Sequence, residues 1–106
     1  MNRGEIWWAD LPDPWGRRLI LLLSRSDAYS LLNIALVAPL TTRLRRGPTF
    51  VPLMPDVDDV PAASVVSLDH VQVVYQSLID RFVTTLSPEK MTEVDHAIHV
   101  ALGLDD

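Results

Sequence analysis

The sequence has 106 residues, a length at which one domain can bury roughly two thirds of the surface that its unfolded chain exposes. It contains no cysteine, which excludes a disulfide framework and cysteine-ligated zinc. The formal net charge of -5 by itself argues against nucleic-acid binding. Its distribution does not, because residues 1–50 hold seven arginines and four acidic residues, a net charge of +3, whereas residues 51–106 carry -8. A basic surface can therefore form from the first half of a single domain that spans residues 1–106.

The sequence shows no signal for export or for membrane insertion. The N-terminal residues lack the apolar stretch of a signal peptide, and no apolar run approaches the roughly 20 residues of a membrane span. We therefore expect a cytoplasmic protein.

Short strand-like segments fill most of the chain. Residues 4–11 contain aromatic and β-branched side chains that suit a pleated surface, and a connection rich in Pro and Gly follows at 12–16. The apolar run 19–23 is too short for a typical helix and predicts a strand buried on both faces. Residues 25–32 predict a loop or a single helical turn, and the aspartate-rich segment 56–63 predicts an exposed loop. Further strands are expected at 34–40, 49–53, 64–68, 71–75 and, as a shorter one, near 82–84.

One clear helix is expected near the C-terminus. Ser87 can cap it, Pro88 suits its first turn and Glu89 complements its dipole, while Gly103 is a natural stop. Several short strands followed by one amphipathic helix predict a mainly β fold, a small β-barrel with a C-terminal α-helix. The apolar residues at helical spacing are Met91, Val94, Ile98, Ala101 and Leu102.

Two apolar runs carry polar side chains at one end only, the first run at its start and the second at its end. Arg17 and Arg18 open the run GRRLILLLS, and Thr41, Thr42 and Arg43 close the strand part of ALVAPLTTRLRR. If the two runs pair antiparallel, the start of the first lies beside the end of the second, and guanidinium and hydroxyl groups share one rim. That combination suits a phosphate, because guanidinium donates to anionic oxygens in a planar, bidentate way and a threonine hydroxyl both donates and accepts.

Five segments, in order, resemble the MazF/PemK toxins of bacterial type II toxin-antitoxin systems. The resemblance implies an SH3-like (CcdB/PemK-type) barrel, a homodimer, and a metal-independent endoribonuclease that needs no cofactor and cuts single-stranded RNA. It also implies inhibition by a cognate, MazE-like antitoxin whose tail occupies the RNA groove. The segments are RGEIWWADL, GRRLILLLS, VAPLTTR, SVVSLDHVQVV and LSPEKMTEVDHAIHVALGL.

Within this resemblance, Arg18 matches the family's catalytic arginine and Thr41 its catalytic threonine. RNA can be cleaved without metal when its own 2′-hydroxyl attacks the adjacent phosphorus and leaves a 2′,3′-cyclic phosphate. Arg18 would stabilise the developing negative charge, with proton donation to the leaving oxygen as the weaker assignment, and Thr41 would hold the phosphate or the attacking hydroxyl. Arg17, Thr42 and Arg43 are expected to position the RNA.

Two positions depart from the family pattern. Leu19 stands where the family usually has Pro after its arginine, and His70 stands where many members have a Gln that contacts RNA. A histidine can stack on a base, hydrogen-bond to it or join proton transfer. The connection 11–17 is also shorter than the loop of many relatives, which would leave the groove more open.

For several other residues the sequence allows both a functional and a purely structural role. Arg45 and Arg46 either bind phosphate or belong to a solvated turn. Trp15, in the Pro-rich connection, is the best candidate among the tryptophans for stacking on a base or contacting the antitoxin. His96 and His99 lack an evident third ligand, so no metal site is expected.

The alternative function is a non-catalytic barrel that pairs with an antitoxin, either an inactive toxin descendant or a relative of gyrase poisons. The terminal sequence Gly103-Leu104-Asp105-Asp106 lacks the aromatic tail by which gyrase poisons are recognised, which argues against the second version.

Overall fold

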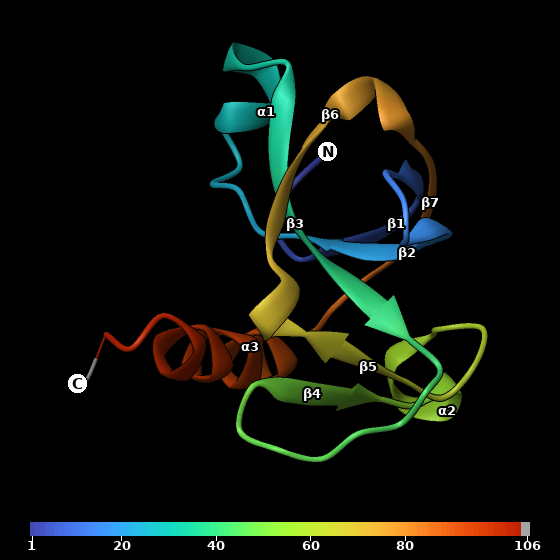
Figure 1. Ribbon diagram of the computed structural model, residues 1–106, viewed down its shortest axis with the longest axis vertical. Helices are drawn as coiled ribbons and strands as arrows, with labels where there is room; N and C mark the ends of the chain where they lie inside the picture. Colours follow the sequence, from blue (N-terminus) through green and yellow to red (C-terminus); the bar gives the residue numbers. More distant parts are fainter. Residues whose placement is uncertain (105–106) are drawn as a thin grey trace.

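Short strands and one longer helix account for most of the computed structural model, which describes residues 1–104 (Figure 1). Asp105 and Asp106, which contribute to the argument about an aromatic tail, lie outside the described residues. The strands are β1 (Glu5–Leu11), β2 (Gly16–Leu22), β3 (Ile34–Thr41), β4 (Phe50–Leu53), β5 (Ser64–Ser67), β6 (Gln72–Tyr75) and β7 (Ile79–Thr85). The helical elements are α1 (Ala28–Leu31), α2 (Pro55–Asp58), α3 (Pro88–Ala101) and the 3-10 turns η1 (Leu68–His70) and η2 (Gln76–Leu78). The expected mainly β fold with a C-terminal helix is confirmed.

All strand pairs of the sheet are antiparallel, and β3 is shared between its two parts. The hydrogen-bonded path runs β4-β5-β3-β2-β1-β7, with β6 attached to β3, and bends into a barrel-like shape without closing between β4 and β7 (Figure 1). Over its first half β3 pairs with β6, and it also pairs with β2, whereas its last residues, Leu40 and Thr41, pair with β5. The end of β3 therefore lies where the two parts of the sheet meet.

Strand β2 is buried on both faces, as the apolar run predicts. Leu21 belongs to a core cluster that includes Val94 and Ala97 of α3, whereas Ile20 and Leu22 belong to a second cluster on the opposite face. Successive side chains of a strand point to opposite faces, so a continuous apolar run can supply both clusters. The strand is thereby fixed from two sides.

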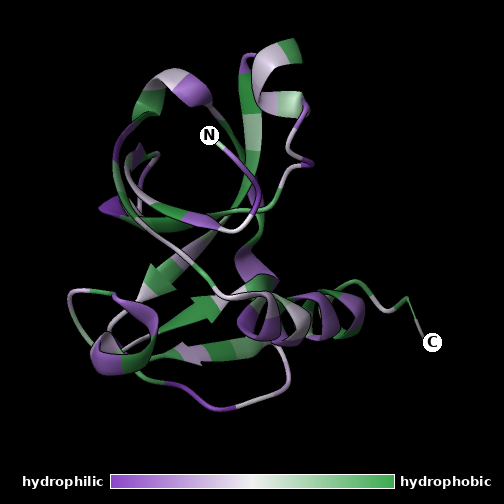
Figure 2. Cartoon of the chain, turned by 180° about the vertical axis from the view of Figure 1, so that it is seen from behind, coloured by the Kyte–Doolittle hydropathy of each residue, from purple (hydrophilic) through white to green (hydrophobic). Residues whose placement is uncertain are grey.

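Helix α3 begins and ends as the sequence predicts. The Ser87 hydroxyl accepts a hydrogen bond from the Lys90 amide at 3.1 Å. At the other end Gly103 adopts a φ of 66°, and the Leu104 amide donates to the His99 carbonyl at 3.0 Å, which is the Schellman pattern. Hydrophilic and hydrophobic residues alternate around the helix, and its apolar side covers the sheet (Figure 2).

The segment 56–63 is not simply an exposed loop. It overlaps the helical turn α2, where the Asp58 side chain is buried and its Oδ2 accepts a hydrogen bond from the Met54 amide at 2.8 Å. Val60 is buried as well. The last strand is also longer than expected, because β7 pairs with β1 from Ile79 onward.

No helix formed by residues 1–104 is both long enough and apolar enough to cross a bilayer.

Candidate functional site

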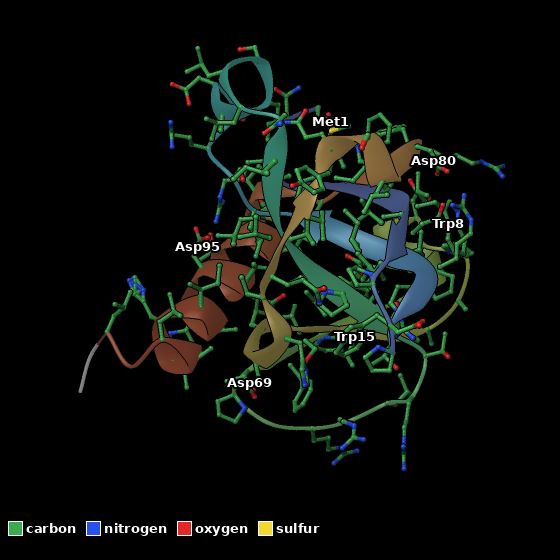
Figure 3. The ribbon with its side chains drawn as sticks, turned by 45° about the horizontal axis from the view of Figure 1, so that its top comes forward. Met1, Trp8, Trp15, Asp69, Asp80 and Asp95 are labelled. Atoms are coloured by element: carbon green, nitrogen blue, oxygen red, sulfur yellow. The ribbon has the colours of Figure 1, made fainter. Side chains whose placement is uncertain are left out.

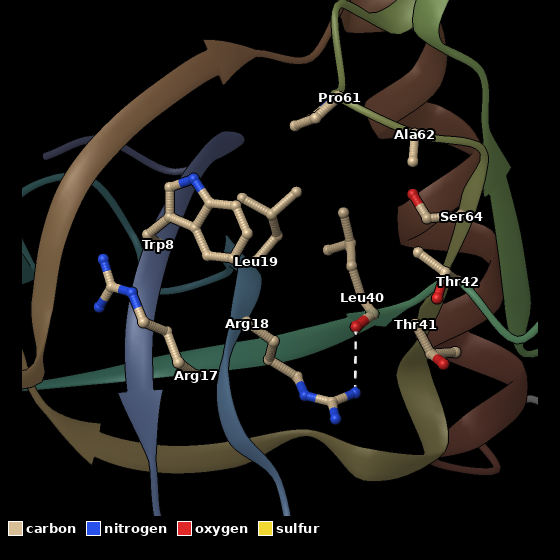
Figure 4. Close-up of a pocket in the computed structure, with 10 residues that line it drawn as sticks. All are labelled: Trp8, Arg17, Arg18, Leu19, Leu40, Thr41, Thr42, Pro61, Ala62 and Ser64. Carbon is tan, nitrogen blue, oxygen red and sulfur yellow. Dashed lines mark hydrogen bonds between the residues drawn. The ribbon is translucent and has the colours of Figure 1, made fainter.

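The structure brings Arg18 and Thr41 to the same edge of the sheet, where the start of β2 lies near the end of β3, and we call this edge the rim. Strands β2 and β3 pair antiparallel from Ile20 opposite Pro39 to Leu22 opposite Val37, and Arg18 and Thr41 each lie two residues beyond the Ile20–Pro39 pair on their own strands. Both residues line one pocket of about 310 Å³ (Figure 4). The adjacency expected from the two apolar runs is therefore present.

Backbone carbonyls and an aromatic ring hold the Arg18 side chain. Its Nε donates to the Trp15 carbonyl at 2.9 Å, and one terminal nitrogen donates to the Leu40 carbonyl at 3.3 Å, the dashed line in Figure 4. The guanidinium carbon lies 5.0 Å from the Trp15 ring centroid, a cation–π distance. Among the ion pairs of residues 1–104, none involves Arg18. Its charge is thus oriented but not neutralised by a carboxylate.

Arg17, the adjacent residue, is surrounded differently. It makes two hydrogen bonds of 3.0 Å to Asp80 and one of 3.0 Å to Asp10, and its guanidinium carbon lies 5.6 Å from the Trp8 ring (Figure 3 labels Trp8 and Asp80). The hydrogen bonds that Arg17 donates to Asp80 and, next in size, to Asp10 raise the pKa of Arg17, and the hydrogen bond from Arg17 lowers the pKa of Asp80. The charge of Arg17 is therefore balanced locally.

A second pocket of about 530 Å³ shares Arg18 and Thr41 with the first. It collects most of the other residues that the sequence predicts, while Thr42 lines only the first pocket. Arg46 lines neither of these two pockets and lies instead in a separate one beside Leu44 and Met54. The predicted residues in the second pocket are Trp15, Arg18, Thr41, Arg43, Arg45 and His70.

Short-range contacts orient the polar groups of the second pocket. The Nδ1 atom of His70 lies 2.7 Å from the hydroxyl of buried Ser67, and the His70 ring stands edge-on to the Trp15 ring at a centroid distance of 4.9 Å. The Thr41 hydroxyl accepts a hydrogen bond from the Arg43 amide at 3.1 Å. Trp15 thus contacts both the guanidinium of Arg18 and the imidazole of His70.

Several residues that line the first pocket are not among those that the sequence predicts for the site. Leu40 and Trp8 come from strands whose pairing places them near Leu19, so a strand register could have found them. Pro61 and Ala62 come from the connection that precedes β5, where the sequence carries no such signal. Ser64, the first residue of β5, completes this wall.

Residues 1–104 contain no group of three or more His, Asp and Glu side chains arranged to hold a metal ion. His96 and His99 are both exposed on α3.

Comparisons with known proteins agree on one family. A family model described as PemK-like, MazF-like toxin of type II toxin-antitoxin system matches residues 2–102. A relative from Mycobacterium tuberculosis, named probable endoribonuclease MazF5, is 37% identical over 100 residues, which cover 94% of this chain and 91% of that protein. The solved Mycobacterium tuberculosis toxin MazF-mt6 is similar with a TM-score of 0.84 at 29% identity, covering 93% of this chain and 96% of that one.

A mycobacterial endoribonuclease in complex with its cognate antitoxin shares the fold, with a TM-score of 0.86 at 24% identity over 98% of this chain and 96% of that one. Both the family model and the relatives extend over nearly the whole length of the chain. The chain therefore belongs to the PemK-like, MazF-like toxins of type II toxin-antitoxin systems.

Proposed function

We propose that the chain is a toxin that acts as a metal-independent endoribonuclease on single-stranded RNA in the cytoplasm. The observation that supports the proposal is that Arg18, without a carboxylate partner among residues 1–104, lines the same two pockets as Thr41. Relatives named endoribonuclease support the activity.

The proposed reaction is a transesterification within the RNA. The 2′-hydroxyl loses its proton as its oxygen forms a bond to the adjacent phosphorus, and the bond to the 5′ oxygen breaks as that oxygen takes up a proton. The products carry a 2′,3′-cyclic phosphate and a 5′-hydroxyl. Charge on the phosphoryl oxygens grows in the transition state, and the Arg18 guanidinium donates to those oxygens from a geometry fixed by two carbonyls. Thr41 positions the phosphate or the attacking hydroxyl.

The neighbouring cations and His70 would hold the RNA on either side of the cut. Arg43 and Arg45 line the second pocket with His70, where they can contact phosphates and a base. Thr42 would contribute from the first pocket. Arg17 remains a predicted RNA contact, although two carboxylates already occupy its donors, and Arg46 would act at a distance from the reacting phosphate.

Cleavage by the purified protein tests the proposal. Incubation with a varied pool of single-stranded RNA in EDTA should give fragments that end in 2′,3′-cyclic phosphate. Arg18→Ala and Thr41→Ala should each lower the rate at least about 100-fold, because each removes a group that acts on the reacting phosphate. Cleavage is followed by gel and the fragment ends by mass spectrometry.

Matched variants separate loss of chemistry from loss of fold. Arg25→Ala and Thr85→Ala change exposed residues of the same types outside both pockets and should cut like the unmodified protein. Intact RNA over the whole pool would contradict the endoribonuclease and favour the non-catalytic binding module.

We also propose that the protein forms a homodimer and is inhibited by a cognate antitoxin that covers the rim. A mycobacterial relative with this fold was solved with its own antitoxin. Trp15 is half-buried between Arg18 and His70, so a polypeptide lying over the rim would contact its ring. The antitoxin should then stop cleavage, and Trp15→Ala should weaken that inhibition.

A further inference from the structure

The first pocket contains a buried hydroxyl that nothing in the described chain satisfies. Ser64 is only 3% exposed, and its Oγ has no hydrogen-bond partner among residues 1–104. Figure 4 shows this hydroxyl beside Ala62 and Thr42, across the pocket from Trp8. Buried hydroxyls in proteins are nearly always hydrogen-bonded, and one left unpaired lowers the stability of the fold. Ser64 lines the first pocket, so a rotation about its Cα–Cβ bond that turns the hydroxyl toward the pocket would give it a ligand atom as the missing partner.

The rest of the pocket wall is mostly apolar and includes a flat aromatic surface. Trp8 and Leu19 are opposite each other in the β1–β2 register, and Leu40 continues the wall from β3. Pro61 and Ala62 form the wall on the side of the connection before β5. Such a pocket favours a planar, uncharged ring that makes few hydrogen bonds.

The charge at the Trp8 side of the pocket does not favour a phosphate there. Arg17 lines this side, but its hydrogen bonds to Asp10 and Asp80 balance its charge. Arg18, by contrast, has no carboxylate partner among residues 1–104 and lines the same pocket together with Thr41. A nucleotide can thus place its phosphate at Arg18 and its base against the apolar wall.

We propose that this pocket is a nucleobase subsite of the RNA and that the Ser64 hydroxyl determines base preference by hydrogen-bonding the edge of the base. The inference rests on the proposed endoribonuclease function and assigns a residue to its substrate recognition. RNA is favoured over a peptide because Arg18 and Thr41, which would act on the phosphate, are part of the same wall. The base occupies the nucleotide adjacent to the cleaved bond.

Ser64→Ala tests the subsite, since it removes the hydroxyl at nearly constant volume. The 5′ ends of fragments from a randomised RNA pool give the base preference at each position around the cut, and a set of single oligonucleotides that differ only at the affected position gives kcat/KM. The variant should lose about tenfold in kcat/KM on the preferred base, the value of one neutral hydrogen bond, and should discriminate less among the four bases there. Its Tm should not fall, because the hydroxyl has no partner to lose within residues 1–104.

Ser24→Ala is the matched control. The Ser24 hydroxyl accepts a hydrogen bond of 2.8 Å from the Leu36 amide, and Ser24 lines neither the first nor the second pocket. Its replacement should lower Tm and leave the base preference unchanged, the reverse of the pattern expected for Ser64→Ala.

The outcomes separate this inference from the proposed function. If the unmodified protein cuts no RNA, the endoribonuclease proposal fails and the subsite fails with it. If the unmodified protein cuts RNA but Ser64→Ala keeps the same base preference, only the subsite is overturned. A Ser64→Ala variant that changes inhibition by the antitoxin without changing base preference would show a peptide site instead and would also overturn the inference.

Discussion

Arg17 and Arg18 are neighbours in β2 and carry the same formal charge, yet their surroundings prepare them for different roles. Arg18 donates to the carbonyls of Trp15 and Leu40, which orient the guanidinium while leaving its positive charge uncompensated. Arg17 donates to carboxylates, so an RNA phosphate has to compete with Asp80 for the same N–H groups. The partners of each side chain, more than its residue type, decide which arginine is available to an anion.

Asp80→Asn should strengthen RNA binding by releasing Arg17. Ion contacts between exposed side chains are weak, so the Kd for single-stranded RNA should fall by no more than about fivefold at low salt. Binding is measured by fluorescence anisotropy with RNA that carries 2′-deoxyribose at the cut position, since that RNA lacks the attacking hydroxyl.

Asp95→Asn is the matched control for this change. It removes the same charge from α3, where Asp95 pairs with Arg3 at 2.7 Å, on the side of the molecule away from Trp8 and Asp80 (Figure 3). An equal gain in affinity from both variants would contradict the release of Arg17 and would indicate a general effect of net charge.

Among the elements, the helical turn α2 depends on a side chain that the sequence pattern alone misinterprets. Asp56, Asp58 and Asp59 look alike in a polar segment, but only Asp58 is buried, where its carboxylate accepts from the Met54 amide and lies 4.0 Å from the Lys90 ammonium. Polarity predicts exposure on average, and it cannot show which aspartate has a buried donor to satisfy. The same limit applies to the start of β7, which follows from its pairing with β1.

Asp58→Ala should lower the free energy of unfolding by about 1–3 kcal/mol, because it leaves the Met54 amide without its acceptor in a part-buried place. Urea denaturation followed by tryptophan fluorescence measures the change. Asp56→Ala, an exposed position on the same turn, should stay within about 0.5 kcal/mol of the unmodified protein. Equal losses for the two variants would contradict the role of the Asp58 hydrogen bond.

Other elements follow directly from local sequence. The continuous apolar run of β2 reports burial on two faces, and the Ser87-Pro88 pair with Gly103 sets both ends of α3. The rim was predictable too, because antiparallel pairing of β2 with β3 places the start of β2 near the end of β3. The wall of the first pocket was not, since Pro61 and Ser64 reach it through a connection whose path depends on the tertiary fold.

For the whole molecule, the distribution of charge matters more than its negative sum. The arginines of the first half include four that line the two pockets, Arg17, Arg18, Arg43 and Arg45. The acidic half supplies α3 and the segment around α2. A chain with a net charge of -5 can therefore present a basic rim to RNA.

The salt dependence of RNA binding should reveal the phosphate contacts that the arginines of this rim make. Each phosphate contact adds roughly 0.7 to the slope of log Kd against log salt for a single strand, so Arg43→Ala and Arg45→Ala should each reduce the slope by about that amount. Arg25→Ala, whose guanidinium pairs with Asp27 at 2.8 Å, should leave the slope unchanged. The uncleavable RNA and a salt titration give the measurement, and identical slopes in all four proteins would contradict binding at the rim.

The sharing of β3 between two parts of the sheet has a consequence for local unfolding. The hairpin of β4 and β5 is hydrogen-bonded to the remaining strands through the last residues of β3, Leu40 and Thr41. Fraying of that short ladder would move Ser64 away from Arg18 and disassemble the pocket while β1, β2 and β7 stay paired. The geometry of the pocket is therefore coupled to the closed state of this two-residue ladder.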